Sequence, residues 1–546
     1  MGSHRVGRLV RHRILWYLLI AVVALYGVVF RIVGLGRSIW LDEAWVGNSI
    51  AAGSLTGMFR YDAWLQTSPP LFLLLERITV GTFGLTASTF RLVPLLFGLL
   101  AVLWMFLLTR RVVAPRYVLL GWSLFALSPI AILYAKTLKQ YSVELAVATA
   151  VFLTCIRYLE HPSLRRFWLL VATVGTGLLL AYPVAFLLPG IIPVVAMTQD
   201  QPRSSVTPAA AIKSSGLLRG LILSAVAGGI LLGIYFLFVV PNTSPDLHSF
   251  FANDTGGLSF VRAAAADGYN VFSFFPFPAS LLARRKLVGG AFGLLVFTGF
   301  LLACLRFREG TRRWLEVQII FGVPVFLLII SWALQLYPMR ARTGLFILPA
   351  LILLFLCDLQ LILDFSLRLL RTEWAELTLD IALVCAALLV VGADVKKQPL
   401  ATLRAPDEDV ASAVSFLRSR VQRGDLLWVH ASCSEAFKLY TRMMEWRDAP
   451  AQFGDTGWPC CPRGIPVVEG ATTEADVRRD INSGVPASFS GRVWLLYTGR
   501  NSHWKFIGAD EPKILDDVFR QRGCSQTPTP AFHNIVVNSF DCRARR

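Results

Sequence analysis

Charged side chains are scarce in this chain of 546 residues. Asp, Glu, Lys and Arg make up 16% of the sequence, whereas a soluble domain carries about 25%, and hydrophobic types reach 55%. Apolar runs long enough to cross a lipid bilayer recur along the chain. This balance excludes an ordinary soluble protein and indicates a polytopic membrane protein surrounded by membrane lipids.

Several recognition motifs are missing as well. The C-terminal part holds no GxGxxG and no GxxxxGK[ST], so its strand-helix alternation does not imply nucleotide binding. Cys460 and Cys461 lack the CxxC spacing of zinc sites and have no accompanying HxxxH, which disfavours zinc. The net charge of +18 does not indicate nucleic acid, because the basic residues form short clusters between apolar runs and not one contiguous face.

Eleven apolar runs are predicted to span the membrane, on the rule that about twenty apolar residues cross a bilayer. These runs are 14–33, 92–109, 117–134, 143–158, 167–181, 184–198, 217–240, 287–305, 315–335, 344–364 and 378–393. With eleven crossings every basic loop cluster falls on one side. The positive-inside rule then places the N-terminus in the cytoplasm and the C-terminus outside the plasma, or inner, membrane. The first run is predicted to be an uncleaved anchor and not a signal peptide, because it is long and lacks a clear cleavage site.

Two apolar segments have alternative interpretations. The runs on either side of Tyr182 and Pro183 could form one kinked crossing, but later basic clusters would then change side. The run 69–83 would also invert every later loop if it crossed the membrane. We therefore expect it to lie at, or dip into, the outer interface.

The sequence becomes charged and mixed from about Asp394. Short strands are predicted at 425–430, 465–469, 492–498 and 534–540, with helix-like segments between them, which favours an α/β domain. Five of the nine cysteines lie here, which indicates an oxidising compartment and up to two disulfides. The predicted domains are a membrane domain at 1–394, with a first extracytoplasmic loop at 34–91, and a soluble extracytoplasmic α/β domain at 395–546.

Two adjacent carboxylates, Asp42 and Glu43, stand just beyond the first apolar run. Ionisable side chains beside the bilayer are costly unless they are paired or hydrated, so their positions are informative. The other outer-side candidates are Arg60, Asp62, Glu76, Arg77, Arg91, Lys136, Lys139, Glu144, Arg340 and Arg342. Carboxylates from one loop and cations from two others suit a site that deprotonates a hydroxyl and holds a phosphate.

Each of these features has a simpler interpretation. Arg340 and Arg342 could anchor a helix end at lipid headgroups, and Lys136 could snorkel to the interface. The two carboxylates could be a solvated helix start capped by Ser38. If the stretch is helical, Asp42 and Glu43 point about 100° apart, so only one can face a given atom. The expected buried stripe of that helix is Leu41, Trp45, Ala52, Leu55 and Phe59.

Four motifs resemble those of the GT-C glycosyltransferases. They are WLDEAW (40–45), SPPLFLLLERI (68–78), SPIAILYAKTLKQYSVELA (128–146) and YPMRARTGLFILPAL (337–351). Their order and sidedness are similar to those of glycosyltransferase family 39, which includes protein mannosyltransferases and aminoarabinose transferases. The resemblance covers residues 10–395. Gln66, Thr67 and Ser68 depart from the histidine or charged residue common before the PPL element, and Lys139 stands where an arginine is usual.

The resemblance implies an enzyme that moves a hexose or pentose from a polyprenyl-phosphate carrier to an acceptor hydroxyl outside the membrane, with inversion. The acceptor would be a glycan, a lipid or a protein. The implied site residues are Asp42 and Glu43 for catalysis, Arg340, Arg342, Lys136 and Lys139 for the donor phosphate, and Arg60, Asp62, Tyr141 and Tyr337 in support. Asp42, Glu43 and Asp62 could also hold a divalent cation, although no ligand spacing demands one.

Two other classes of protein share part of this pattern. A transporter, or flippase, of lipid-linked sugars would use the same cations, but it needs no outer base and is expected to show inverted repeats, which this sequence lacks. A receptor or scaffold would use the outer α/β domain to bind partners and would leave the convergent charges unexplained. The transferase interpretation accounts for the charges.

Overall fold

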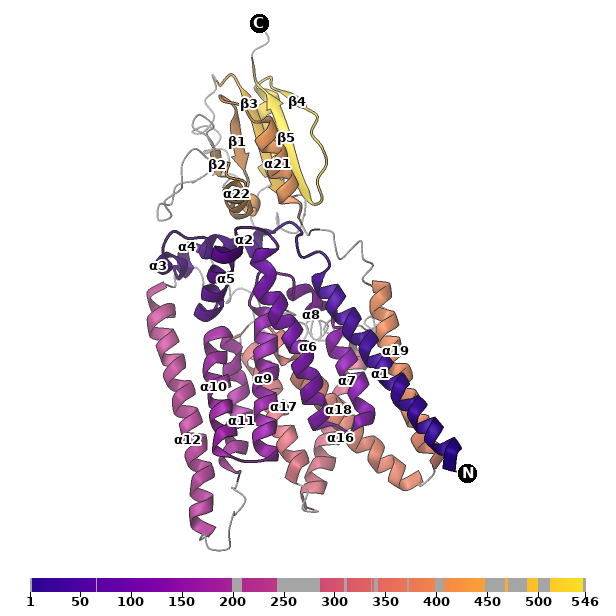
Figure 1. Cartoon of the computed structure of the whole chain (residues 1–546). Coiled ribbons are helices and arrows are strands. Elements are labelled where there is room, and N and C mark those ends of the chain that lie inside the picture. The colour runs from indigo at the N-terminus through magenta and orange to yellow at the C-terminus, as the bar shows by residue number, and fades with distance from the viewer. Residues whose placement is uncertain are drawn as a thin grey trace. The chain divides into compact units, whose positions relative to one another are not determined.

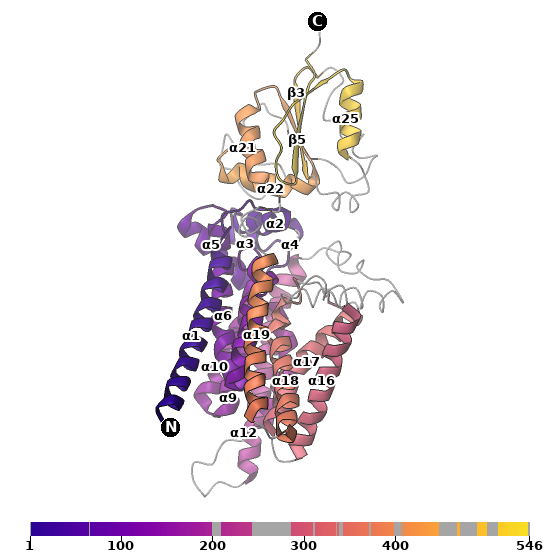
Figure 2. The same ribbon diagram turned by 90° about the vertical axis from the view of Figure 1, so that its right-hand side faces the viewer.

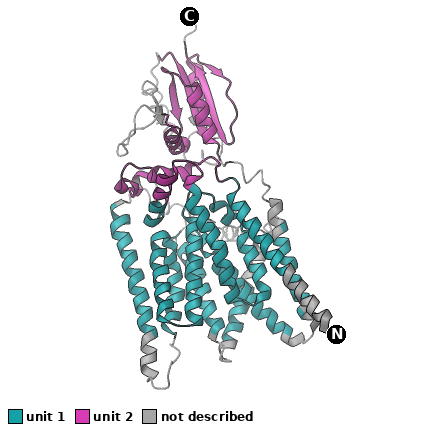
Figure 3. Ribbon diagram, viewed as in Figure 1, with its two compact units in different colours: residues 1–34, 68–75, 91–403 teal, residues 35–67, 76–90, 404–546 magenta. Residues whose placement is uncertain are grey.

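The structure is a computed structural model, and it describes residues 2–64, 66–198, 209–242, 285–308, 312–334, 336–337, 342–370, 373–397, 406, 408–446, 467–469, 489–498 and 511–543. Arg340, Cys460 and Cys461 lie outside these residues. The chain divides into two compact units (Figure 3). Unit 1 comprises Met1–Gly34, Ser68–Leu75 and Arg91–Leu403, and unit 2 comprises Leu35–Thr67, Glu76–Phe90 and Arg404–Arg546. Most of the first outer loop, counted above with the membrane domain, thus clusters with the C-terminal part.

Unit 1 is a bundle of helices that run side by side (Figure 1). Its α-helices are α1 (Gly2–Ile32), α6 (Leu92–Val112), α7 (Pro115–Ala126), α8 (Pro129–Tyr134), α9 (Tyr141–Glu160), α10 (Leu164–Leu180), α11 (Leu188–Ala196), α12 (Ala209–Ile234), α16 (Arg285–Arg308), α17 (Arg312–Ala333), α18 (Leu348–Leu370) and α19 (Glu373–Lys397). Short turns of other helix types are η1 (Thr89–Arg91), η2 (Tyr182–Leu187), η3 (Tyr235–Val239), η4 (Val240–Asn242) and η5 (Leu345–Ile347).

Each predicted span is largely helical over its described residues. Within the described residues, five helices are long and apolar enough to cross a membrane: Thr89–Val112, Tyr141–Glu160, Gly216–Val239, Arg313–Trp332 and Leu345–Leu367. Shorter apolar helices occupy Trp16–Ile32, Tyr182–Ala196, Leu294–Leu305 and Thr378–Val390. The total of eleven crossings stays a prediction.

The predicted span 117–134 is broken into α7 and α8. Ser128 caps the new helix by accepting a hydrogen bond from the amide of Ala131, and Pro129 occupies the first helical position, where its missing N–H costs nothing.

Glycines allow neighbouring helices to approach closely. A Cβ on Gly177 of α10 would lie 2.7 Å from Cγ1 of Val147 on α9, so a larger residue there would have to displace that side chain.

Unit 2 contains a five-stranded sheet in the order β2-β1-β3-β5-β4. Its strands are β1 (Leu426–Val429), β2 (Val467–Glu469), β3 (Arg492–Thr498), β4 (Ser525–Thr527) and β5 (Ile535–Asp541). Strand β1 pairs in parallel with β2 and β3, whereas β5 pairs antiparallel with β3 and β4. Four of the strands lie where the sequence predicts them. Strand β4 does not, because its Ser-Gln-Thr sequence carries no apolar alternation.

Helices cover both faces of this sheet. Figure 2 shows α25 (Glu511–Gln521) on one face and α21 (Val410–Arg420) on the other, with α22 (Ala431–Met443) beside α21. On the α25 side, Phe519 packs in a buried cluster with Trp428 and Phe540. All four residues of β1 are buried, as expected for a central strand that is covered on both faces.

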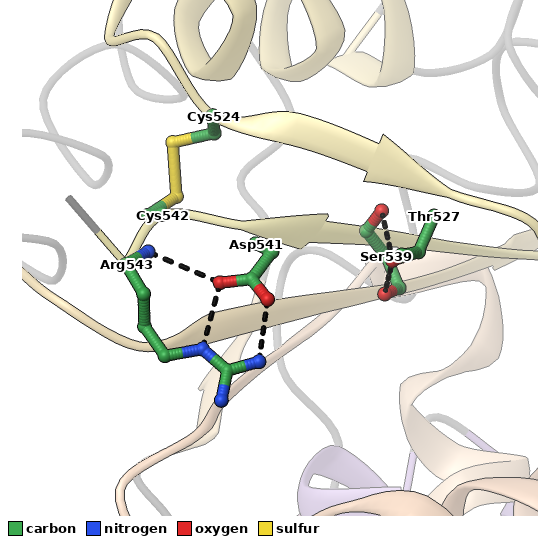
Figure 4. The surroundings of a disulfide bond; sticks show 6 residues. All are labelled: Cys524, Thr527, Ser539, Asp541, Cys542 and Arg543. Carbon is green, nitrogen blue, oxygen red and sulfur yellow. Dashed lines mark hydrogen bonds and ion pairs between the residues drawn. A yellow bond between two sulfur atoms is a disulfide. The ribbon is translucent and has the colours of Figure 1, made fainter. Parts of the chain in front are cut away.

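A disulfide joins the ends of two neighbouring strands. Cys524, just before β4, is bonded to Cys542, just after β5, and the adjacent Arg543 and Asp541 form an ion pair (Figure 4). Disulfides persist in oxidising compartments. The same two cysteines are among the five that the sequence places in the C-terminal part.

Candidate active site

The two adjacent carboxylates open a short helix in unit 2. Helix α2 (Leu41–Ile50) carries Asp42 and Glu43 in its first turn, where the helix dipole favours negative charge. Glu43 is completely buried, and Asp42 is half-buried. The two side chains therefore lie in different surroundings, as the helical geometry predicts.

The helix-start interpretation of this stretch is wrong in two respects. Trp40, and not Ser38, occupies the N-cap position, and its side chain makes no capping hydrogen bond. Glu43 is not solvated. The expected buried stripe is also wrong, because α2 ends at Ile50 and Leu55 lies exposed in the next helix, α3 (Leu55–Met58).

The first loop folds back on the C-terminal end of α2. Arg77, from α5 (Pro70–Phe83), donates to the carbonyl oxygens of Ile50 at 3.3 Å and Ala52 at 2.8 Å. A cation at this end complements the negative pole of the helix dipole. Arg77 thus serves as a C-terminal cap of α2. In the same region Ser49 donates to the carbonyl of Met58 at 2.7 Å, and Gln66 Nε2 donates to Ser49 Oγ at 3.1 Å.

The other first-loop candidates lie in varied surroundings. Arg60 is exposed, and Asp62 belongs to α4 (Tyr61–Trp64) with its side chain outside the described residues. Glu76 on α5 is completely buried, and neither of its carboxylate oxygens has a hydrogen-bond partner among the described residues. Burial raises the pKa of the Glu76 carboxyl well above its ordinary value, because the charged form loses its hydration.

Lys136, in unit 1, caps a helix. Its Nζ donates to the carbonyl oxygens of Phe30 at 3.1 Å and Val33 at 2.9 Å, at the C-terminal end of α1. The side chain is 1% exposed, so it does not snorkel to the interface. Arg31 makes the reciprocal contact by donating to the carbonyl of Ala126, the last residue of α7, at 2.7 Å.

A second group of polar side chains gathers where α9 begins. The Tyr337 hydroxyl donates to the carbonyl of Thr343 at 3.0 Å, and the Tyr337 ring packs edge-on against Phe186 with 5.1 Å between centroids. Burial, and then the nearby negative charges of Glu144 and Tyr141, raise the pKa of Tyr337. Tyr141, Glu144 and Tyr337, from two motifs almost 200 positions apart, therefore lie together in unit 1.

Two basic residues lie close in sequence to this group of polar side chains. Lys139 is half-buried and lies just before α9, and Arg342 is half-buried and lies next to Thr343. Gln140, at the N-cap position of α9, accepts a hydrogen bond from Ser68 at 3.3 Å through its side chain. The SPPL motif and the start of α9 are thus joined within unit 1.

Sequence reasoning gave too little weight to Glu144 and missed Asp358. Glu144 is 4% exposed, and its Oε2 has no partner in the described part of the chain. Asp358, in the middle of α18, is completely buried and accepts a hydrogen bond from Gln318 of α17. A lone acid within an apolar run such as LILLFLCDLQL is a signal that could have revealed it.

The described side chains do not form a metal centre. Among them, no group of three or more His, Cys, Asp or Glu residues is placed to hold a metal ion. Asp42 and Glu43 alone supply too few described ligands for the suggested divalent cation.

Comparison with known proteins supports the resemblance drawn from the motifs. Residues 67–227 match the family described as dolichyl-phosphate-mannose-protein mannosyltransferase. The crystal structure of ArnT from Cupriavidus metallidurans bound to undecaprenyl phosphate superposes with a TM-score of 0.50 at 15% identity, covering 96% of this chain and 97% of that one. The apo state of ArnT gives a TM-score of 0.51 at 14% identity, covering 98% of each chain. The resemblance to the GT-C glycosyltransferases is confirmed.

An oligosaccharyltransferase shows a weaker structural similarity to the chain. The oligosaccharyltransferase of Archaeoglobus fulgidus, tethered with an acceptor peptide, gives a TM-score of 0.47 at 12% identity and covers 88% of this chain and 69% of that one. No curated protein matches the chain in sequence. The fold is thus that of ArnT along almost the whole length of both chains.

Proposed function

We propose that this protein is an integral-membrane glycosyltransferase that uses a polyprenyl-phosphate-linked sugar. The observation that carries the proposal is the match of residues 67–227 to a family described by a lipid-phosphate-linked sugar donor. That segment contains the SPPL motif and the cluster at the start of α9. A relative of the same fold was crystallised with undecaprenyl phosphate, which supports a carrier of this chemical class.

The proposed reaction is a single displacement at the anomeric carbon. An acceptor hydroxyl attacks from the face opposite the phosphate, the bond from the anomeric carbon to the phosphate oxygen breaks, and the anomeric centre inverts. The hydroxyl proton passes to Asp42, and the carrier leaves as polyprenyl phosphate. We assign the base to Asp42 and not to Glu43, because Asp42 is half-buried whereas Glu43 is enclosed.

The departing phosphate needs positive charge. We assign this task to Arg340, Arg342 and Lys139, since preorganised cations stabilise charge that develops in a transition state. Lys136, which the motif also suggests, already donates to two carbonyl oxygens of α1. We therefore propose that it supports the site structurally. Tyr141 and Tyr337 are proposed to shape the same region, and Arg60 and Asp62 to lie at its edge.

We further propose that the chain is a multi-pass protein of the plasma, or inner, membrane with residues 395–546 outside. The Cys524–Cys542 disulfide supports this orientation, because such bonds are rare in a reducing cytosol. A reagent that cannot cross the membrane should label a Ser419→Cys variant in intact cells more strongly than the parent chain. Labelling only after lysis would overturn this topology.

The transfer reaction can be tested directly. Mass spectrometry of carrier lipids that co-purify with the protein would identify candidate donors, and labelled polyprenyl-phosphate hexoses and pentoses can then be offered to the purified enzyme with membrane acceptors. We expect release of polyprenyl phosphate together with a labelled glycan, lipid or protein. Movement of the intact donor across sealed vesicles without cleavage would instead identify a flippase.

A further inference from the structure

Helix α2 is too short to hold its own position. It has 10 residues, whereas isolated helices shorter than about 12 to 15 residues are marginal in water. Its amino end carries the proposed base, so a small displacement of the helix would move Asp42. A displacement of about 1 Å can cost about a hundredfold in rate when it misaligns reacting groups.

Residues from the C-terminal part of unit 2 form hydrogen bonds with the residues just before α2. The hydroxyl of Tyr440 on α22 accepts a hydrogen bond from the amide of Ile39 at 2.6 Å and lies 3.2 Å from Ser38 Oγ. Ser38 Oγ in turn accepts a hydrogen bond from the amide of Ala411, in the first turn of α21, at 3.1 Å. Ile39 is completely buried and Tyr440 is 3% exposed, so these bonds are shielded from water.

Helix α22 also forms hydrogen bonds with the C-terminal half of α2. Asn48 Nδ2 donates to the carbonyl oxygen of Glu435 at 3.0 Å and to its carboxylate at 2.7 Å. Arg442 donates to the carbonyl of Ala51, the C-cap residue of α2. Glu435 and Arg442 are seven positions apart on α22, which puts them on one face of that helix. The charged partners make these bonds stronger than neutral ones.

Helix α22 is itself firmly held. It follows β1, the strand between β2 and β3, after a single residue, His430. The amide of His430 donates to the carbonyl of Leu496 on β3 at 2.9 Å, and its ring nitrogen accepts from the amide of Ser432 at 3.1 Å. A helix tied to the sheet in this way is a rigid support for a neighbouring functional element.

We propose that α22 of the C-terminal α/β domain positions α2, and thereby Asp42, for transfer, with Tyr440, Glu435 and Arg442 as positioning residues. The inference rests on the proposed function for its catalytic consequence. The α/β domain is then a working part of the active site.

The first test removes one oxygen atom. Tyr440→Phe keeps the ring but loses both contacts to residues 38 and 39. We expect kcat to fall about ten- to a hundredfold, while the KM for the donor changes by less than about twofold. Tyr497→Phe is the matched control, because the Tyr497 hydroxyl lies in the same sheet domain and accepts from Asn538 at 2.9 Å. Unchanged kcat in Tyr440→Phe would overturn the proposal.

The second test reverses a hydrogen bond. Asn48→Asp faces the Glu435 carboxylate with a like charge and should lower kcat. Adding Glu435→Gln supplies an amide donor to the new carboxylate, so the double variant should recover part of the lost rate, while the bond to the backbone carbonyl of residue 435 stays lost. A merely additive loss in the double variant would contradict positioning through this pair.

Hydrogen exchange of residues 39–52 separates the position of α2 from the reaction. Tyr440→Phe should speed exchange of these amides, and Tyr497→Phe should not. Faster exchange with unchanged transfer overturns the proposal, and so does unaltered exchange. If the wild-type protein transfers no sugar from any polyprenyl-phosphate donor, the proposed function fails, and the exchange result alone decides whether α22 holds α2.

Discussion

Lys136 Nζ lies 2.9 Å from the carbonyl oxygen of Val33, one residue beyond the end of α1. We expect Lys136→Met to destabilise unit 1 by about 1 to 3 kcal/mol, because two buried carbonyls lose a charged donor. Unfolding in detergent would measure the loss, with Lys139→Met as the control at a half-buried position nearby. A Lys136→Met protein that is as stable as wild type but no longer binds the donor would show that the ammonium binds phosphate.

The two adjacent carboxylates should differ in their effect on chemistry. Asp42→Asn keeps the size of the side chain but loses its basicity, so we expect the chemical step to slow by about 10² to 10⁴ while donor binding survives. Glu43→Gln should act mainly on stability, since Glu43 is completely buried. Transfer and carrier-lipid binding would be measured in parallel. Near-normal transfer by Asp42→Asn would place the base elsewhere.

Arg342 offers a test of phosphate binding. Arg342→Ala should weaken use of the donor on the order of tenfold, and Arg342→Lys should rescue it only partly, because lysine lacks the bidentate fork of arginine. Arg340 should behave in the same way. Arg165→Ala, at an exposed arginine of α10, is the control. If all of these variants use the donor as well as the wild-type enzyme does, Arg340 and Arg342 anchor a helix end at lipid headgroups and do not bind the donor phosphate.

Glu76 should make the stability of the protein depend on pH. Its pKa is raised in the folded state, so the folded protein keeps the proton after the unfolded chain has lost it. Stability therefore falls as pH rises from about 4.5, the unfolded value, toward the higher folded pKa. Glu76→Gln should flatten this decline in melting temperatures measured between pH 5 and pH 8. Glu445→Gln, at an exposed carboxylate, should leave it unaltered.

Replacing Gly299 in the helix bundle should destabilise the protein. A Cβ on Gly299 of α16 would lie 2.5 Å from the Cβ of Asp358 and closer still to its carboxylate, so Gly299→Ala must push α16 and α18 apart. We expect a loss of about 1 to 3 kcal/mol, as for other overpacked cores. Gly322→Ala in α17 is the matched control, because nothing lies within 4 Å of the added methyl. Equal melting temperatures for the two variants would contradict this packing.

The sequence predicts local features of this protein better than its long-range contacts. Apolar runs locate the helices of the bundle, and strand-like runs locate β1, β2, β3 and β5, because burial imposes a pattern on consecutive residues. The break between α7 and α8 was not predicted within the span 117–134, although Ser128 and Pro129 form a local helix-start signal there. These signals need only a few neighbouring residues.

The contacts that define the candidate site leave no such pattern. Lys136 donates to carbonyl oxygens 103 and 106 positions away in the sequence. From sequence alone, a basic residue near the end of a span is equally compatible with a phosphate ligand, a snorkelling side chain or a helix cap. Tyr440 meets Ile39 across 401 positions, where no periodicity connects the two. The burial of Glu43 also depends on such tertiary packing.

The separation of 401 residues between Ile39 and Tyr440 has a consequence during biosynthesis. At about 5 to 20 residues per second, roughly 20 to 80 seconds pass between synthesis of the first partner and the second. Throughout that interval Ser38, Asn48 and Ala51 lack the partners that α22 provides. The amino-terminal helices can enter the bilayer long before α2 acquires its final surroundings. A ribosome that stops before residue 440 therefore releases a chain in which α2 lacks the contacts of α22, so the first-synthesised part of the candidate site is among the last to be assembled.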